Sequence, residues 1–454
     1  MSRLAAHLND AGITLLDGER ILYREPGFAL LEDDQLTTGN RAFASARVNP
    51  RNIQHRYWVN LQTEAIADRR FSYLTAADLA SRQLEQMIKA TGQRNPELIL
   101  AVPPWMGVQN LGLLLGIATE LGIKVVGLVD AAVAATRREY RNAVPVHVDM
   151  GLHAATLTRL AQPGQVQVEK AEVLDDCGVY VLYDAWITTI AEAFVMQSRF
   201  DPLHTAETEQ LLLNRLGGWL TQAAGQDQVE LTLEYAGASY SASIESLALV
   251  GQAAPVYQQV ASKLRALFRA GELPAIQISD RVARLPGLAA MLKARVGGEV
   301  FVLEAGATAR GALSRLRDRA DSGGVSLLRQ LPWDQSAIEV VVETSVQASA
   351  GTPTHLLFGS KAYAIGNSAL DLGSQETEGN RSIALASDMP GVSRRHCSLV
   401  LQDGQCLLQD HSRYGTFLNG HRISSSAVLQ VGDSIRIGSP GFEFLLITTD
   451  ESHG

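Results

Sequence analysis

Hydrophobic and polar positions between residues 75 and 150 follow strand and helix periods in turn. Residues 98–102 (LILAV) and 123–129 (IKVVGLV) are short apolar runs, which are typical of strands buried on both faces. Residues 109–121 follow helical spacing between these runs, and residues 130–140 predict a further helix. Strands that alternate with helices in this way indicate a parallel sheet covered on both faces.

Two other stretches follow the pattern of antiparallel hairpins. After Asp149, strand patterns at 155–160 (ATLTRL) and 165–173 (QVQVEKAEV) are separated by the turn signal QPGQ. The beginning of the chain is similar, because ITLL, ERILY and FALLE are separated by Asp-Gly and Pro-Gly pairs. Two halves that each open with a meander predict an internal duplication of architecture.

A polar segment rich in turn residues, 318–337, predicts a linker that divides the chain into two regions. The region before it is α/β, over 1–317, with lobes of about 1–145 and 146–317, and the region after it, 338–454, is almost entirely strand and turn. In the second lobe the pattern predicts helices over 187–222, 252–270, 285–296 and 307–316, and strands at 275–279 and 300–303.

Composition and charge narrow the classes of partner. The 454 residues carry a net charge of -9, which argues against nucleic-acid binding because phosphate backbones need a concentrated basic surface. Neither a signal peptide nor a run of about 20 apolar residues is found, so we expect a cytoplasmic protein without a membrane span. The 3 cysteines are too few and too far apart for a disulfide scaffold or a zinc site, so we expect no bound metal.

Residues 1–317 resemble the actin-like ATPase superfold of bacterial actins, heat-shock chaperones and sugar kinases, which is built from two ribonuclease H-like halves. The likeness rests on three stretches. Residues 97–136 resemble a strand, helix and small-residue helix of bacterial actins, VHVDMG (146–151) resembles the second phosphate loop, and ISDRVARLPGL (278–288) resembles the adenosine loop. The resemblance implies a bacterial protein, with ATP and Mg as ligands and self-association into filaments.

The first phosphate loop of that family departs most from its pattern here. His7 stands where the metal-holding aspartate is expected, and Asn9 and Asp10 stand where glycine and threonine are expected. A side chain at 9 and a carboxylate at 10 both oppose the close approach of phosphate oxygens.

The other two loops are also altered. Asp149 and Gly151 are retained as candidate nucleotide-binding residues, but Leu152 and His153 replace glycines whose N–H groups would face phosphate. Residues 279–281 (SDR) occupy the usual double-glycine region. Three altered loops together predict a pseudo-ATPase that does not hydrolyse nucleotide and has no catalytic residues.

The second region contains a strong hairpin signal in CSLVLQDGQCLLQD, residues 397–410. Two alternating strands flank Asp403-Gly404, which favours a two-residue type I′ turn. That turn pairs Leu401 with Cys406 and Cys397 with Asp410. The two cysteines then lie about 13 Å apart, beyond the roughly 7 Å Cα limit of a disulfide, so they are expected to be core thiols.

The loops that flank this hairpin, GVSRRH and HSRYGTFLNG, emerge at the same end because antiparallel strands return to where they began. Ser393, Arg394 and Arg413 therefore converge. Guanidinium groups and a hydroxyl on supported loops suit a phosphate ester, which carries about -1.5 to -2 charge at neutral pH.

Residues 338–454 resemble a forkhead-associated (FHA) domain, an all-β sandwich that binds phosphothreonine peptides. The matching motifs are YAIGN, VSRRH, the stretch from Asp410 to Gly420 and LQVGDSIRIG. The resemblance implies that Ser393 donates to phosphate, that His396 braces its loop and that Gly366 and Gly415 support the site. It further implies contacts to phosphate or peptide by Arg394, Arg413, Tyr414 and Asn419.

One position departs from the FHA pattern. Asn367 follows the glycine of YAIGN, where the family usually has an arginine that contacts phosphate. Arg381 in a nearby insertion is a candidate replacement, whereas Glu376 and Glu378 in the same insertion would oppose a phosphate.

Three functions follow as hypotheses. The first is a non-catalytic signalling scaffold whose FHA domain binds a threonine-phosphorylated protein. The second is an active actin-like ATPase or filament former that the FHA domain targets. The third is phospho-independent assembly through both regions, which the asparagine at 367 favours.

Overall fold

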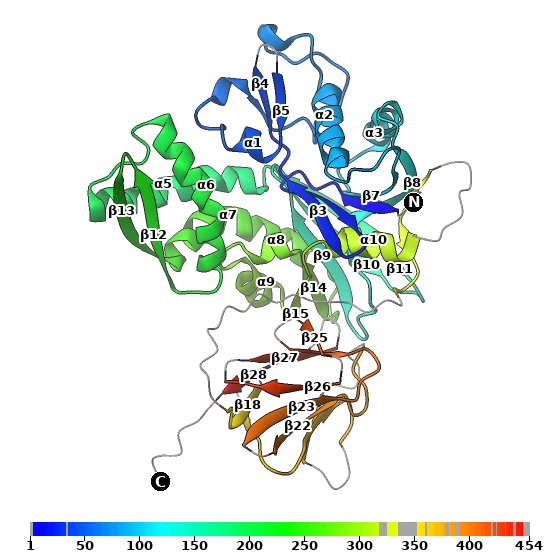
Figure 1. Cartoon of the computed structure of the whole chain (residues 1–454). Helices are drawn as coiled ribbons and strands as arrows, with labels where there is room; N and C mark the ends of the chain where they lie inside the picture. The colour runs from blue at the N-terminus through cyan, green and yellow to red at the C-terminus, as the bar shows by residue number, and fades with distance from the viewer. Residues whose placement is uncertain are drawn as a thin grey trace. The chain divides into compact units, whose positions relative to one another are not determined.

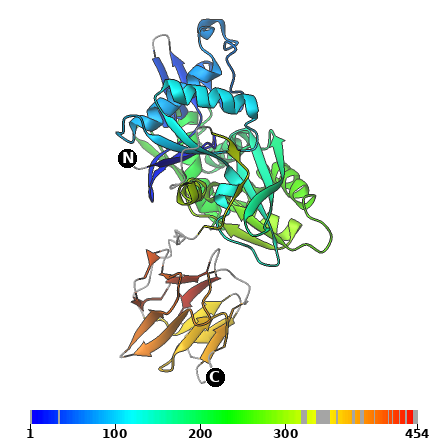
Figure 2. The same ribbon diagram turned by 90° about the vertical axis from the view of Figure 1, so that its right-hand side faces the viewer.

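The computed structural model describes residues 3–32, 35–316, 325–334, 352–358, 361–376, 381–385, 391–402, 404–418, 421–423, 425–431, 433–438 and 442–447. Backbone contacts divide the chain into two compact units. Unit 1 comprises residues 1–137, 144–302 and 306–334, and unit 2 comprises residues 138–143, 303–305 and 335–454. Figures 1 and 2 show that unit 1 mixes helices with strands, whereas the elements drawn in unit 2 are strands.

The first sheet of unit 1 has the strand order β16-β8-β7-β1-β2-β3. Strands β1 to β3 form an antiparallel meander, and β7, β8 and β16 extend the sheet in parallel on the other side of β1. The bounds are β1 (Leu4–His7), β2 (Ile13–Asp17), β3 (Arg20–Glu25), β7 (Glu97–Val102), β8 (Lys124–Asp130) and β16 (Leu327–Leu328).

The second sheet repeats this arrangement with the order β15-β14-β9-β10-β11-β17. Strands β9 to β11 form the meander, and β14 and β15 run parallel on the other side of β9. The internal duplication of architecture is therefore present. The bounds are β9 (Val144–Met150), β10 (Ala154–Ala161), β11 (Val166–Asp175), β14 (Pro274–Ile278), β15 (Glu299–Val302) and β17 (Gln330–Leu331).

Helices cover both faces of the first sheet, as its sequence pattern indicated. Alternate residues of β1 face opposite sides, so Leu4 and Ala6 pack in one core with α2 and α3 while Ala5 packs in another with α4 and α10. The bounds are α2 (Ala76–Lys89), α3 (Val108–Glu120), α4 (Ala131–Ala135) and α10 (Ala307–Leu316). Leu160 and Val166 of the second sheet join the core of α4 and α10, which therefore lie between the two sheets.

Two expectations for the first half are corrected. The strand FALLE leaves the first sheet after the Pro-Gly turn, and β4 (Ala29–Glu32) pairs instead with β5 (Gln35–Thr38) and β6 (Ile53–Gln54). The helix expected over 130–140 ends at Ala135, since Arg137 turns away to form a buried ion pair with Asp334. Three short helices complete this half, namely α1 (Asn40–Phe43), η1 (Pro50–Asn52) and η2 (Arg69–Phe71).

The helical part of the second half also differs from its pattern. The helix expected over 187–222 is two helices, α5 (Val179–Ser198) and α6 (Ala206–Ala223), because Arg199 takes a left-handed conformation and Thr205 caps the next helix. An unforeseen hairpin, β12 (Gln228–Tyr235) and β13 (Ala238–Glu245), follows them. The remaining helices are α7 (Ser246–Arg265), α8 (Asp280–Ala283) and α9 (Leu288–Val296).

Helix α5 is the one helix among the described residues that is long and apolar enough to cross a membrane. Its face with Trp186, Ile190 and Phe194 is buried in the core of the second half, and the Trp186 indole donates a hydrogen bond to the Leu249 carbonyl at 2.9 Å. That packing is typical of a core helix.

The expected linker contains part of unit 1. Residues 325–334 belong to that unit, where β16 pairs with β8 and β17 pairs with β11. Short strands of two residues carry too weak a period to be recognised in a turn-rich segment. Residues 317–324 and 335–337 lie outside the described residues.

Unit 2 is a sandwich of two sheets, with strand orders β19-β18-β28-β27-β24-β25 and β21-β20-β22-β23-β26. The hairpin register is as predicted, because Cys397 pairs with Asp410 and Leu401 with Cys406, and both thiols are fully buried. The bounds are β18 (His355–Phe358), β19 (Lys361–Ala364), β20 (Leu370–Gly373), β21 (Arg381–Ala384), β22 (Cys397–Gln402), β23 (Gln405–Asp410), β24 (Thr416–Leu418), β25 (His421–Arg422), β26 (Ser426–Leu429), β27 (Ser434–Ile437) and β28 (Phe442–Ile447).

Candidate functional site

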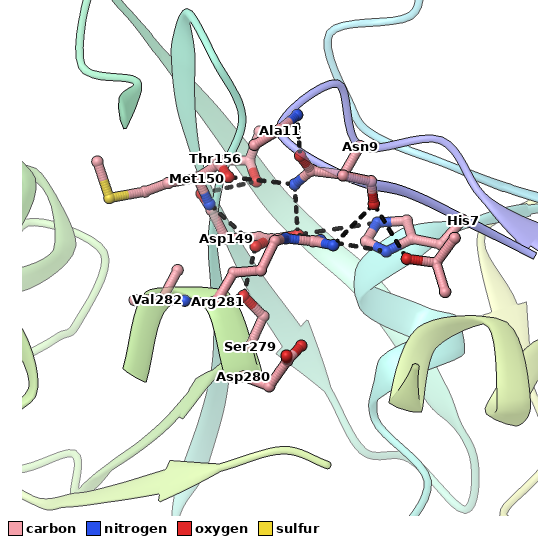
Figure 3. Close-up of polar contacts among 12 residues, drawn as sticks. His7, Asn9, Ala11, Asp149, Met150, Thr156, Ser279, Asp280, Arg281 and Val282 are labelled. Atoms are coloured by element: carbon pink, nitrogen blue, oxygen red, sulfur yellow. Dashed lines mark hydrogen bonds and ion pairs between the residues drawn. The ribbon is translucent and has the colours of Figure 1, made fainter. Parts of the chain in front are cut away.

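Asp149, near the end of β9, is the centre of a buried polar cluster between the two halves of unit 1 (Figure 3). Its carboxylate accepts hydrogen bonds from Asn9 Nδ2 at 2.7 Å and from Ser279 Oγ at 2.5 Å. Arg281 Nη2 lies 3.2 Å from the same carboxylate. Asn9 follows β1, while Ser279 caps α8 and Arg281 lies within it, so the cluster joins both halves.

The guanidinium group of Arg281 compensates the buried charge of Asp149. Arg281 Nη1 also donates to the Gly12 carbonyl at 2.9 Å, which fixes the side chain in place. Burial alone would raise the pKa of Asp149, but the nearby Arg281, His7 and His147 and the hydrogen bond from Ser279 together outweigh burial and hold that pKa well below its ordinary value. Burial, followed by the charge of Arg281, lowers the pKa of His7 to about 3, so its ring is neutral at pH 7.

The carboxylate of Asp10 accepts a hydrogen bond from the turn that follows β9. Asp10 Oδ1 accepts a hydrogen bond from the Leu152 N–H at 2.8 Å, and the Gly151 N–H donates to the Ala154 carbonyl at 2.8 Å. Burial raises the pKa of Asp10 to about 6. The N–H groups of Gly151 and Leu152 at this turn therefore both donate to the chain itself.

A cavity of about 320 Å³ opens beside the cluster and was not anticipated from the sequence. Its walls are mostly apolar and come from α5, α6 and residues 281–285, which are far apart in the chain. Met150 and Arg281 belong to both the cavity and the cluster, and Arg284 adds a second cation. Cavities of this size hold small organic molecules in other proteins.

His396 joins the two loops of the second candidate site, in unit 2. Its Nδ1 accepts a hydrogen bond from the Ser393 N–H at 3.1 Å, and its Nε2 lies 3.1 Å from the Gly415 carbonyl oxygen. Because Nδ1 accepts, the ring proton is on Nε2 and is donated to Gly415. Burial lowers the pKa of His396 and keeps the ring neutral. This is the arrangement expected of a residue that braces the loops from behind.

Ser393 and Arg413 lie together, as the sequence predicted. The Arg413 N–H donates to Ser393 Oγ at 3.2 Å, which leaves the hydroxyl proton of Ser393 able to donate to a ligand. The Arg413 guanidinium carbon lies 5.8 Å from the centroid of the Tyr414 ring. Arg394, Arg413 and Tyr414 are exposed. Within the described part of the chain, neither Arg394 nor Arg413 forms an ion pair with a carboxylate.

The strand that runs up to Ser393 is β20, which ends at Gly373. The Ser374 N–H donates to the Ser393 carbonyl at 3.0 Å, and the Gln375 N–H donates to the Arg394 carbonyl at 3.2 Å. A Cβ atom on Gly373 would lie 2.7 Å from the carbonyl carbon of Arg394. The glycine at this position therefore allows the end of β20 to approach the loop that carries Ser393 and Arg394.

The structure does not bring Asn367 or Gly366 to these loops, which corrects the sequence expectation. The Gly366 carbonyl accepts from Leu401 N–H at 2.9 Å, near the closed end of the β22–β23 hairpin. Leu401 is four positions beyond Cys397, about 13 Å along the strand, and Ser393 lies farther in the same direction. The motif YAIGN therefore predicted Gly366 as the glycine of the site, whereas Gly373 is the glycine that contacts the Ser393 loop.

Arg381 lies at that closed end as well. Its Nη1 would be 3.9 Å from a Cβ atom on Gly366, and Arg381 pairs in register with Leu370 at the start of β20. Arg381 therefore does not replace the missing arginine beside Ser393. Asn419 and Glu378, also considered from the sequence, lie outside the described residues.

Sequence reasoning missed Arg422, whose side chain lies against Gly415. A Cβ atom on Gly415 would be 3.0 Å from both Cδ and Cζ of Arg422, and Gly415 has a φ of 98°. Arg422 pairs with Phe417 in the β24–β25 ladder. The sequence held a signal for this pairing, because an Asn-Gly pair favours a two-residue turn, and such a turn pairs Phe417 with Arg422.

Comparison with known proteins gives a family match within unit 2. No curated protein matches the chain. Residues 367–438 match the family model described as the FHA domain. This range contains Ser393, His396, Arg413 and the two loops that His396 joins. The C-terminal β-sandwich of this chain thus contains an FHA domain, the module that binds phosphothreonine peptides in signalling adaptors.

Proposed function

We propose that the chain is a non-catalytic signalling scaffold in which the FHA domain binds a threonine-phosphorylated protein. The observation that carries this proposal is the pair of loops joined by His396, which holds the Ser393 hydroxyl beside the backbone N–H of Arg413, whose side chain is exposed. Arginine clusters on rigid loops are the recurrent means of phosphate capture.

Binding to phosphorylated and plain peptides tests this function. The full chain is titrated into a fluorescein-labelled mixture of peptides with central phosphothreonine and random flanks, and into the same mixture with threonine. Phosphorylated peptides should bind more tightly, and Ser393→Ala should weaken that binding about tenfold or more because one charge-assisted hydrogen bond is lost.

Ser368→Ala is the matched control, since Ser368 is exposed and adjoins Asn367 at the closed end of the hairpin. It should leave the anisotropy titration unchanged. Equal affinity of the wild-type chain for both peptide mixtures would falsify the phosphate-dependent function and would favour phospho-independent assembly.

For unit 1, we propose a degenerate actin-like module that does not hydrolyse nucleotide. This proposal is supported by two contacts that occupy groups a nucleotide would need. Arg281 compensates the charge of Asp149, and Asp10 accepts a hydrogen bond from the Leu152 N–H in the turn after β9. The duplicated strand order supports the actin-like assignment. The cavity beside the cluster is the feature that favours the alternative, a nucleotide-binding module with self-association.

A further inference from the structure

We propose that Arg422 supplies the second guanidinium of the phosphate site in unit 2, in place of the arginine expected after the glycine. This inference rests on the proposed phosphothreonine binding and identifies a residue that sets its affinity. It follows from four observations on the described residues.

The first observation is where a phosphate would lie. The Ser393 hydroxyl and the Arg413 N–H are 3.2 Å apart, and both project from loops that His396 holds at the open end of the hairpin. A phosphate that accepts from Ser393 is therefore next to the Arg413–Gly415 segment.

The second observation is the path of the Arg422 side chain. Its Cδ and Cζ atoms cover Gly415 closely enough that a Cβ atom there would be 3.0 Å from each. Gly415 is two residues from Arg413, a separation of at most about 7 Å. The Arg422 guanidinium is therefore carried to the side of the loop where Ser393 and Arg413 meet.

The third observation is that Arg422 is free to take an anion. Its side chain is exposed, and in the part of the chain that the structure describes it forms no ion pair with a carboxylate. Arg395, two positions after Ser393, differs because Asp371 Oδ1 lies 3.1 Å from its Nε. A partnered arginine gives up an ion pair to bind phosphate, whereas Arg422 gives up no ion pair with a described carboxylate.

The fourth observation excludes the residues near Gly366 that the sequence offered. Asn367 and Arg381 adjoin Gly366 near the closed end of the hairpin, more than about 13 Å from Ser393. The residue that follows Gly373 at the site is Ser374, which carries no charge. Among these positions, Arg422 is the cation at the correct end.

The test compares Arg422→Gln with Arg381→Gln in the full chain, using the phosphothreonine and threonine peptide mixtures. Both substitutions remove one positive charge from unit 2, so general electrostatic attraction changes equally. We expect Arg422→Gln to weaken phosphopeptide binding about tenfold, the effect of one charge-assisted pair, and Arg381→Gln to leave it unchanged. Arg422→Lys should recover part of the loss, because lysine keeps the charge without the fork.

One further measurement, thermal unfolding, separates a loss of binding from a loss of stability. Thermal unfolding should be the same for Arg422→Gln and Arg381→Gln, since both side chains are exposed. Equal peptide affinities of the two glutamine variants overturn the role of Arg422 while the phosphate-dependent function stands. A wild-type chain that does not distinguish the mixtures overturns both.

Discussion

Asp149 and Arg281 illustrate how single residues alter the chemistry of a site. The Asp149 carboxylate accepts hydrogen bonds from Asn9 and Ser279 and adjoins Arg281. The guanidinium of Arg281 makes this carboxylate one member of an internal ion pair. The pair lies between the halves of unit 1 and therefore contributes to their packing.

Removing Arg281 should destabilise unit 1 strongly. Asp149 would remain buried without a counter-charge, and breaking one side of a buried pair costs roughly 3 to 5 kcal/mol. We expect Arg281→Gln to lower the free energy of unfolding by about this amount, and addition of Asp149→Asn to recover part of it. Urea unfolding followed by tryptophan fluorescence measures the effect, because all 5 tryptophans lie in unit 1.

Arg284→Gln is the matched control for Arg281. Arg284 is 49% exposed and pairs with Asp280 on the surface of the same short helix, so its loss should cost less than about 1 kcal/mol. Similar destabilisation by the two variants would show that the charge of the segment matters and that the buried pair with Asp149 does not.

At the scale of elements, the site in unit 2 depends on the end of β20. Ser374 and Gln375 donate to the carbonyl groups of Ser393 and Arg394, and only a glycine at 373 leaves room for that contact. The phosphate loop is therefore positioned by a strand that is not its neighbour in sequence.

Gly373→Ala should displace the loop and weaken phosphopeptide binding. The added methyl group would lie 2.7 Å from the Arg394 carbonyl carbon and 3.0 Å from Arg395 Cα. Overpacking of this kind costs about 1 to 3 kcal/mol, so we expect a lower melting temperature of unit 2 and roughly tenfold weaker binding of the phosphothreonine mixture.

Gly366→Ala provides the comparison, since its Cβ atom would meet only Arg381 Nη1, at 3.9 Å. Calorimetry and the anisotropy titration should give wild-type values for this variant. If Gly366→Ala impairs binding as much as Gly373→Ala, the glycine of the site is the one at 366 and the present assignment is wrong.

These two glycines also show what the sequence could and could not predict. The β22–β23 register followed from local information, because a two-residue turn between alternating strands fixes every pair. The choice between Gly366 and Gly373 depends on which strand pairs with β22, and that contact is non-local. Both glycines follow an apolar residue at the end of a strand-like run, so pattern alone favoured the wrong one.

In unit 1, too, local features could be predicted from the sequence and non-local contacts could not. The strand and helix alternation over 98–129 was predictable because each element has its own period. The Asp149–Arg281 pair and the Asp10–Leu152 hydrogen bond were not, because each joins residues more than a hundred positions apart.

At the scale of the whole molecule, the non-catalytic assignment predicts that the purified full chain has no ATP turnover. Asp149 is already compensated, and the N–H groups of Gly151 and Leu152 are already used, so binding of Mg-ATP would have to break three internal contacts. Phosphate release with Mg-ATP should equal that of a heat-inactivated sample, and acid extraction should release no nucleotide. The Asp149→Asn variant distinguishes turnover by this chain from turnover by a contaminating ATPase. Turnover that is present in the wild-type chain and absent from the variant would establish an active ATPase.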